Sequence, residues 1–422
     1  MGTYLNPGNY AFSEAVNSEI FVDKTEMINY LNKVARTKQK YICISRPRRF
    51  GKTMAADMIC AYYGFGGDSH TLFEDKKLAQ ISPIQTESGR VMNWDVYLGK
   101  FNVIRVTMTD FFKRGSSTSK ALSILSSRIL DELSEEYPDV KFDTSDLIYS
   151  MSRFYQKSGI QFVIVIDEWD AIFRLCKDDI QGQTEYLDFL RDWLKDKEYV
   201  ALAYMTGILP IKKYGEHSAL NMFQEFSMTA QRNLAEYTGF TPEEVRQICD
   251  ERNLHYEAMQ EWYDGYHLSN LPSRDLVKEE EIKKLLSSGE FCEYEIYNPL
   301  SVVSAATNKS LENYWNKTET YSALSDYINM NYDGLKSDIA LLMDSGRIKV
   351  DTRKYQNDMS TFHSKDDIFA LLIHLGYLGY DSKSSEVFIP NKELEDEFRL
   401  STTSEEWSSA ILHSIPPGTN TY

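Results

Sequence analysis

The sequence predicts an α/β domain with a parallel sheet flanked by helices, followed by a mostly helical, winged-helix-like domain. In the first half of the chain, short apolar runs alternate with segments of helical periodicity. Those runs are apolar at almost every position, as strands covered on both faces are. Helical segments dominate the second half, which ends in a hairpin-like stretch. We therefore expect domains at residues 1–235 and 236–400, then a polar tail at 401–422.

Four apolar runs are the expected strands of the first domain, at residues 40–45, 102–108, 161–170 and 199–210. The third run, "QFVIVIDEWD", is the strongest, because five apolar residues lead directly into acidic ones. Helices are expected after the first three runs, at residues 52–63, 119–137 and 184–196. This alternation is typical of a parallel sheet covered on both sides.

The second domain opens with a helix start signal. Thr241 is the expected N-cap, Pro242 stands at the first helical position, and Glu244 completes a capping box. Further helical segments are expected at residues 281–288, 299–307 and 324–345. Residues 364–390 read as a helix followed by a short hairpin, which suggests a winged-helix-like module.

Composition narrows the class of protein. The 422 residues are 42% hydrophobic and 13% aromatic, as in an ordinary folded domain protein. No run of 18 apolar residues predicts a membrane span. The N-terminus lacks the features of a secretion signal, and the five cysteines form no C-x-x-C pair. We expect a cytoplasmic protein with free thiols and without a zinc site or disulfide framework.

The chain is strongly acidic. Its formal net charge is −17, from 63 acidic and 46 basic residues. Non-specific binding to nucleic acid depends on basic surface that releases counterions. The chain as a whole is therefore a poor candidate for nucleic-acid binding.

The stretch "SRPRRFGKT", residues 45–53, follows the first expected strand and precedes a helix. Gly51, Lys52 and Thr53 match the end of a Walker A phosphate-binding loop, but Arg46 stands where the first glycine belongs. A helix N-terminus offers free amides to a phosphate, and Gly51 permits a close approach. Lys52 is expected to span the β- and γ-phosphates, and the Thr53 hydroxyl to hold Mg²⁺.

Acidic residues end the strongest strand. Asp167 is expected to bind Mg²⁺ as a Walker B aspartate does, and Glu168 to activate the attacking water. Thr206, which ends the next strand, is either a polar sensor of the γ-phosphate or a threonine that caps a turn. The strand at 102–108 lies between the loop and the acids in the sequence, as in the P-loop class in which one strand separates Walker A from Walker B.

The chain resembles the bacterial AAA-ATPase-like domain proteins, of the STAND-type, archaeal-ATPase-like branch of P-loop NTPases. The resemblance covers about residues 6–398. It rests on eight motifs in order: "FVDKTEMI", "SRPRRFGKT", "VIVIDEWD", "MTGILPIKKY", "GFTPEEV", "WYDGYH", "YNPLSVV" and "LGYLGY…IPNKELEDEF". In this family R-P-R-R-F-G-K-[ST] is itself the loop signature, so Arg46 is not a decayed glycine.

The leading hypothesis is a signalling or regulatory P-loop protein that binds ATP with Mg²⁺ and hydrolyses it. The nucleotide is expected between the two domains, and slow turnover would suit a switch. The residues expected to contact the nucleotide are Arg46, Pro47, Arg48, Arg49, Phe50, Gly51, Lys52, Thr53 and Met54. Pro47 is expected to stiffen the loop, since it fixes its own φ and restricts the residue before it. Arg48 and Arg49 are expected to face phosphates, stabilise the transition state or pair with acids of a neighbouring domain, or else to be solvated.

Family members usually carry a PD-(D/E)XK nuclease-like domain after "IPNKE". Too few residues follow Phe398 for such a domain, so we expect a truncated chain or one that acts on a separate effector. A homo-oligomer that shares an arginine between subunits is a further expectation. The competing interpretation is a nucleotide-binding scaffold without catalysis, or a winged-helix module that binds DNA or protein.

Two smaller features have structural interpretations. Asp23 and Thr25 either shape the base or ribose pocket or cap the helix that follows at residue 26, and we favour the cap. His267, within "WYDGYH", is expected to be a hydrogen-bonded structural residue rather than a catalytic base.

Overall fold

The structure is a computed structural model of the 422-residue chain. It describes all residues except 1, 86–88, 90, 114–116, 212–218, 231, 270–276, 289–292, 316–323, 325–326, 329–330, 353–354, 356–361 and 403–422. The polar tail predicted at 401–422 therefore lies almost entirely outside the described residues.

The chain folds into two compact units. The first contains Met1–Ser45 and Gly51–Phe226, and the second contains Arg46–Phe50 and Ser227–Tyr422. The backbone thus leaves the first unit at Arg46 and returns to it at Gly51, in the middle of the predicted phosphate-binding loop. We call Arg46–Phe50 the front segment of that loop.

The first unit is an α/β structure. Its helices are α1 (Tyr10–Val16), α2 (Met27–Val34), α3 (Lys52–Tyr63), α4 (His70–Phe73), α5 (Lys77–Gln80), α6 (Thr118–Glu136), α7 (Leu147–Ser158), α8 (Ala171–Leu175) and α9 (Ile180–Leu194), with the 3-10 turn η1 (Met108–Asp110). Its strands are β1 (Tyr41–Ser45), β2 (Ile84–Gln85), β3 (Val91–Met92), β4 (Asn102–Thr107), β5 (Phe162–Asp167), β6 (Val200–Gly207) and β7 (Gln224–Phe226).

Five of these strands form one parallel sheet in the order β4-β5-β6-β1-β7. Strand β6 follows β5 in the sequence but lies between β5 and β1 in the sheet. The strand that separates the loop from the acids in space is therefore β6, whereas β4, which separates them in the sequence, lies at the edge. The short strands β2 and β3 form a separate antiparallel pair.

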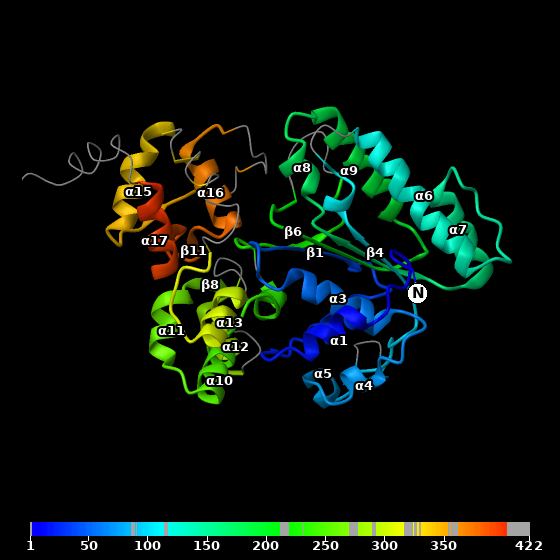
Figure 1. Cartoon of the computed structure of the whole chain (residues 1–422), viewed down its shortest axis with the longest axis horizontal. Helices are drawn as coiled ribbons and strands as arrows, with labels where there is room; N and C mark the ends of the chain where they lie inside the picture. The colour runs from blue at the N-terminus through cyan, green and yellow to red at the C-terminus, as the bar shows by residue number, and fades with distance from the viewer. Residues whose placement is uncertain are drawn as a thin grey trace, which may run out of the picture. The chain divides into compact units, whose positions relative to one another are not determined.

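The sheet is buried on both faces, as its apolar strands predict. On one face, Ile104, Ile164 and Met205 join a core cluster with Leu125 of α6 and Leu190 of α9. On the other face, α3 packs against β4, β5 and β6, and α1 packs on α3. Figure 1 shows α3 and α1 on one side of the sheet and α6 to α9 on the other.

The second unit is mostly helical. Its helices are α10 (Pro242–Arg252), α11 (Tyr256–Tyr263), α12 (Glu279–Ser288), α13 (Pro299–Asn308), α15 (Leu335–Met343), α16 (Lys365–Leu375) and α17 (Lys392–Ser401), with 3-10 segments η2 (Arg232–Tyr237) and η3 (Tyr332–Gly334). Its strands are β8 (Tyr266–Ser269), β9 (Glu293–Ile296), β10 (Ile348–Lys349), β11 (Gly379–Asp381) and β12 (Glu386–Phe388). The sequence α15, β10, α16, β11, β12, with sheet order β10-β12-β11, is that of a winged-helix-like module.

The predicted α/β fold with a helical, winged-helix-like continuation is confirmed. The four expected strands are present as β1, β4, β5 and β6, within two or three residues of their predicted ends. The capping box is also present, since Thr241 Oγ1 accepts a hydrogen bond from Glu244 N and Glu244 accepts one from Thr241 N. Helices α1, α7 and α17 and strand β7 are among the elements that were not predicted.

Two predictions about helices are wrong. Residues 324–345 do not form one helix, because α15 begins only at Leu335, after Asn331, Asp333 and Gly334 with φ of 42°, 51° and 79°. Left-handed residues cannot continue a right-handed helix. The part of this range at 325–326 and 329–330 lies outside the described residues.

The cap expected from Asp23 and Thr25 serves a different helix. No side chain caps α2, whose N-cap is Glu26. Instead, Asp23 accepts a hydrogen bond from Lys77 N at 2.7 Å, and Thr25 Oγ1 accepts one from Leu78 N at 3.1 Å. These two residues therefore hold the start of α5, across 54 and 53 residues of sequence.

Candidate functional site

The carboxyl ends of the parallel strands meet at one edge of the first unit's sheet. Ser45 of β1 is paired with Gly207 of β6, and Ile166 of β5 with Met205 of β6. The residues that follow these positions therefore lie close together, although they come from three separate parts of the chain. In open α/β sheets this edge is where ligands bind.

Asp167 joins two of the predicted site residues. Its Oδ2 accepts a hydrogen bond from Thr53 Oγ1 at 2.9 Å, and its Oδ1 accepts one from Thr206 Oγ1. Asp167 is only 2% exposed. The structure thus brings together the start of α3, the end of β5 and the end of β6 around one buried carboxylate. Two interpretations of Thr206 were open. In the structure, its hydroxyl donates a hydrogen bond to the Asp167 carboxylate.

Gly51 and Lys52 form the turn into α3. Gly51 has φ of 81°, a conformation that favours glycine, and no other atom lies within 4 Å of the position a Cβ would take. Lys52 is buried, with 8% exposure, and burial lowers the pKa of its ammonium to about 8. The neighbouring carboxylates of Asp167, Asp170 and Glu168 act in the opposite direction and favour the charged form.

Glu168 follows directly in the left-handed region, with φ of 53°. A non-glycine residue in this region is strained and tends to occur at functional sites. The side chain of Glu168 is 35% exposed and forms an ion pair with Arg174 of α8, at 2.6 Å. The predicted water-activating carboxylate is therefore accessible and is held by a cation that was not predicted.

Asp170 is the main residue of this site that the sequence analysis did not assign. It is fully buried, and its Oδ2 accepts hydrogen bonds from Ile208 N at 3.0 Å and Leu209 N at 2.9 Å. The same carboxylate pairs with Arg174 at 3.3 Å. Asp170 therefore ties the segment after β5 to the segment after β6. Its place in "VIVIDEWD", three residues after Asp167, is the only sequence signal for it.

The front segment of the loop packs within the second unit. Arg46 is fully buried and donates from Nε to Thr238 Oγ1 at 3.0 Å. Arg49 has φ of 71° and donates from Nη1 to the carbonyl of Tyr314 at 3.0 Å. Of the remaining predicted contact residues, Pro47 and Phe50 are buried, whereas Arg48 and Met54 are exposed. One loop arginine is thus bound to a side chain and another to a main-chain carbonyl.

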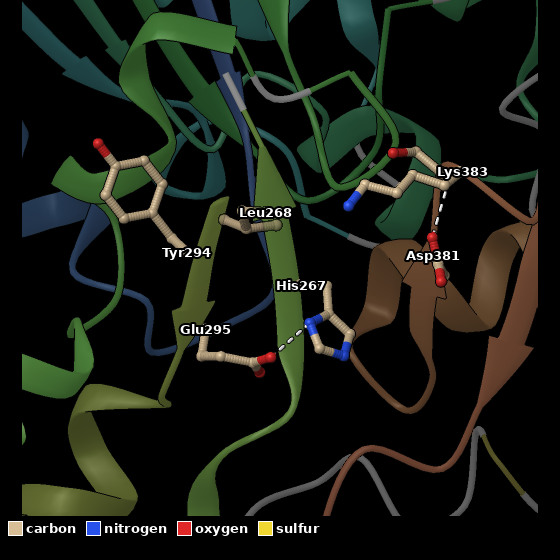
Figure 2. A pocket seen from close by; sticks show the side chains of 7 residues that line it. His267, Leu268, Tyr294, Glu295, Asp381 and Lys383 are labelled. Carbon is tan, nitrogen blue, oxygen red and sulfur yellow. Dashed lines mark hydrogen bonds and ion pairs between the residues drawn. The ribbon is translucent and has the colours of Figure 1, made fainter. Parts of the chain in front are cut away.

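A separate pocket lies in the second unit, away from these residues in the sequence. Its volume is about 220 Å³, and its lining is His267, Leu268, Tyr294, Glu295, Asp381, Ser382 and Lys383. Figure 2 shows the ion pair across β8 and β9 between His267 Nδ1 and Glu295 Oε1, at 2.7 Å. This hydrogen bond raises the pKa of His267. The prediction that His267 is hydrogen-bonded is confirmed.

No group of three or more His, Cys, Asp or Glu residues is arranged to hold a metal ion in the described part of the chain. Within the same residues, no helix has the length and apolar character that crossing a bilayer requires.

Comparison with solved structures finds distant similarity to ATPases. The Walker-type ATPase PABY2304 of Pyrococcus abyssi is 13% identical, with 89% of this chain and 94% of that chain covered and a TM-score of 0.38. The ORC2 protein of Aeropyrum pernix, in ADPNP-ADP complexes, is 9% identical, with 94% and 97% covered and a TM-score of 0.33. Similarity at these TM-scores supports no conclusion about the ligands or partners of this chain.

The sequence was also compared with curated proteins and with protein-family models. Among proteins with curated descriptions, none matches. A family model described as "Predicted AAA-ATPase" matches residues 10–215, which include the loop, the acids at the end of β5 and Thr206. This agrees with the resemblance stated from the motifs, and it covers nearly the whole first unit. Residues 10–215 of this chain are similar to the AAA-ATPase-like family of predicted AAA-ATPases.

Proposed function

We propose that this chain binds ATP with Mg²⁺ and hydrolyses it. The observation that carries the proposal is the hydrogen bond between Thr53 Oγ1 and Asp167 Oδ2, at 2.9 Å. It brings the residue after the loop lysine to the acid that ends the most apolar strand. The match of residues 10–215 to the predicted AAA-ATPase family supports the same function.

The residues present suit a magnesium ion. Mg²⁺ prefers oxygen ligands, and at phosphate sites it takes only one or two from the protein. The Thr53 hydroxyl and the Asp167 carboxylate supply two such oxygens, already hydrogen-bonded to each other. A site of this kind needs no cluster of three acidic or histidine side chains. When bound, the ion would neutralise the charge that develops on the phosphate oxygens.

The other residues have complementary roles in this proposal. The amides at the start of α3 and the Lys52 ammonium would bind the phosphates, because a helix N-terminus attracts anions. Glu168 would take a proton from a water whose oxygen attacks the γ-phosphorus. The bond from that phosphorus to the bridging oxygen then breaks, leaving ADP and phosphate. Thr206 would hold Asp167 in position. Arg174 would hold Glu168 until the water is bound.

Lys52→Ala tests nucleotide binding. We expect the loss of at least about 100-fold in affinity for a nonhydrolysable ATP analogue with Mg²⁺, because the substitution removes a buried cation from the phosphates. Isothermal titration calorimetry measures it. Lys33→Ala, at an exposed position of α2, is the matched control and should bind like the native chain. Equal affinity in the Lys52→Ala and native chains contradicts the proposed site.

Glu168→Gln tests hydrolysis separately from binding. We expect single-turnover hydrolysis of ATP to slow by about 100-fold or more, with nucleotide affinity retained, because the amide cannot take the proton from water. Glu185→Gln, at an exposed position of α9, is the control. Equal rates in native and Glu168→Gln chains would favour the alternative, a nucleotide-binding scaffold without catalysis.

We also infer that the nucleotide state is communicated to the second unit. Two facts support this: the front segment packs within the second unit, and Gly51 to Thr53 belong to the first. Phosphate bound at Gly51 would act on a backbone whose preceding residues, Arg46–Phe50, belong to the second unit. A regulatory ATPase that acts on a separate effector, such as a nuclease-like protein, would use a change of this kind.

A further inference from the structure

We propose that Glu393 is a positioning residue for the phosphate-binding loop, acting on Arg49 through the main chain of Tyr314. Glu393 is the glutamate of "IPNKE", a motif for which the proposed ATPase chemistry has no role. The inference rests on the proposed nucleotide binding and names a residue on which that binding depends.

The front segment needs external support, because its own conformation is strained. Arg49 has φ of 71°, which side chains other than glycine adopt only at a cost. Phe50, the next residue, accepts a hydrogen bond at its carbonyl from Gly239 N at 3.1 Å, and its ring packs edge-on against Tyr266. Arg49 itself donates a hydrogen bond from Nη1 to the Tyr314 carbonyl, at 3.0 Å.

The Tyr314 carbonyl is itself fixed by Glu393. One carboxylate oxygen, Oε1, accepts hydrogen bonds from Tyr314 N at 2.7 Å and from Trp315 N at 2.9 Å. Ser301 Oγ donates to the same carboxylate at 2.9 Å from Oε2. Glu393 is only 1% exposed, so water cannot replace it as an acceptor.

Charge adds to this arrangement. The Glu393 carboxylate attracts the Arg49 guanidinium electrostatically, although the hydrogen bonds run through the Tyr314 main chain. Arg49 stands two residues before Gly51, where the phosphates would bind. A carboxylate on α17 thus controls the geometry of a loop 344 residues earlier in the sequence, through two hydrogen-bonded steps.

Glu397 supplies a matched control. It lies one turn further along α17 and is also a carboxylate with 1% exposure. Its carboxylate accepts a hydrogen bond from Asn313 Nδ2, at 3.5 Å. Substitution of Glu397 therefore removes a buried carboxylate from the same helix while leaving the amides of Tyr314 and Trp315 on Glu393.

The experiment measures affinity for a nonhydrolysable ATP analogue with Mg²⁺ in the full chain. We expect Glu393→Met to weaken binding about tenfold and Glu397→Met to leave it within about twofold of native. Glu393→Gln, whose amide oxygen still accepts both N–H groups, should restore most of the affinity. An unchanged affinity in Glu393→Met, an equal loss in Glu397→Met, or no recovery in Glu393→Gln overturns the proposal.

Substitution of Arg49 tests the same series of contacts, from Glu393 through Tyr314 to Arg49, which we call the relay. This test remains available even if Glu393→Met fails to fold. Arg49→Met should weaken binding about tenfold, and where Glu393→Met folds, the double variant should bind no more weakly than Arg49→Met alone. Native affinity in Arg49→Met, or fully additive losses in the double variant, overturns the relay. If the native chain does not bind the analogue at all, the proposed function is wrong. If the native chain binds it and only Lys52→Ala loses binding, this inference alone is wrong.

Discussion

Lys52 is the buried cation of the candidate site, and its surroundings act on its charge in opposite directions. Burial disfavours the ammonium and lowers its pKa to about 8. The carboxylates of Asp167, Asp170 and Glu168 oppose this effect but do not cancel it. A bound triphosphate would add several negative charges beside it and return the pKa toward its ordinary value.

This predicts proton uptake when nucleotide binds. Near pH 8 the free chain has Lys52 about half protonated, and the complex has it fully protonated, so binding should take up roughly half a proton. Affinity should therefore fall as the pH rises from 7 to 9. Calorimetry in buffers of different ionisation enthalpy measures the uptake. Lys52→Gln, if it still binds measurably, should show none of it, and an uptake that persists there would assign the proton to another group.

Asp170 and Arg174 make a buried pair whose role is structural. Asp170→Asn should destabilise the fold by about 2–4 kcal/mol, because Arg174 and two backbone amides lose a charged acceptor inside the protein. Urea unfolding measures the loss. Asp188→Asn removes an exposed Asp–Arg pair on α9 and should cost much less. Equal losses in the two variants would show that Asp170 is not the link between β5 and β6.

At the scale of single elements, the ends of helices show which local patterns the sequence encodes. Thr241 and Glu244 form the reciprocal bonds of a capping box at the start of α10, as predicted. The start of α6 is different, because Ser117 stands at its N-cap without a side-chain capping bond. The two helices therefore begin with the same kind of residue but with different stabilisation.

Thr241→Ala should lower the free energy of unfolding by about 1 kcal/mol, because it leaves Glu244 N without its acceptor. Chemical denaturation measures this change. Ser117→Ala is the comparison variant and should have almost no effect, since it removes no such bond. A loss in Ser117→Ala as large as that in Thr241→Ala would mean that the cap geometry does not account for the difference.

The order of strands in the sheet is an element-scale feature that local sequence does not contain. Four of the five strands were predicted from their apolar runs, but β6 lies between β1 and β5 although it comes after both. That position brings the Thr206 hydroxyl within hydrogen-bonding distance of the Asp167 carboxylate. Strand order follows from how helices pack on the two faces, which depends on contacts between distant residues.

At the scale of the whole molecule, the two compact units share the phosphate-binding loop. A boundary between domains is usually expected where few contacts cross, in a linker. Here the chain also changes unit at Arg46 and Gly51, inside a functional motif. The predicted boundary near residue 235 lies close in the sequence to the change of unit after Phe226. The assignment of residues 46–50 to the second unit was not predicted.

The sequence by itself determined the apolar strands, the loop ending in Gly51, Lys52 and Thr53, the acids after β5 and the capping box at Thr241, because periodicity, glycine and capping chemistry act over a few residues. Tertiary structure alone decided that Thr53 and Thr206 share Asp167, that Asp170 and Arg174 support this edge, and that Glu393 reaches Arg49 through Tyr314. Apart from the Asp170–Arg174 pair, which lies within one helical turn, these contacts join residues tens to hundreds of positions apart. Their partners are chosen by the packing of whole elements, which leaves no local pattern to read.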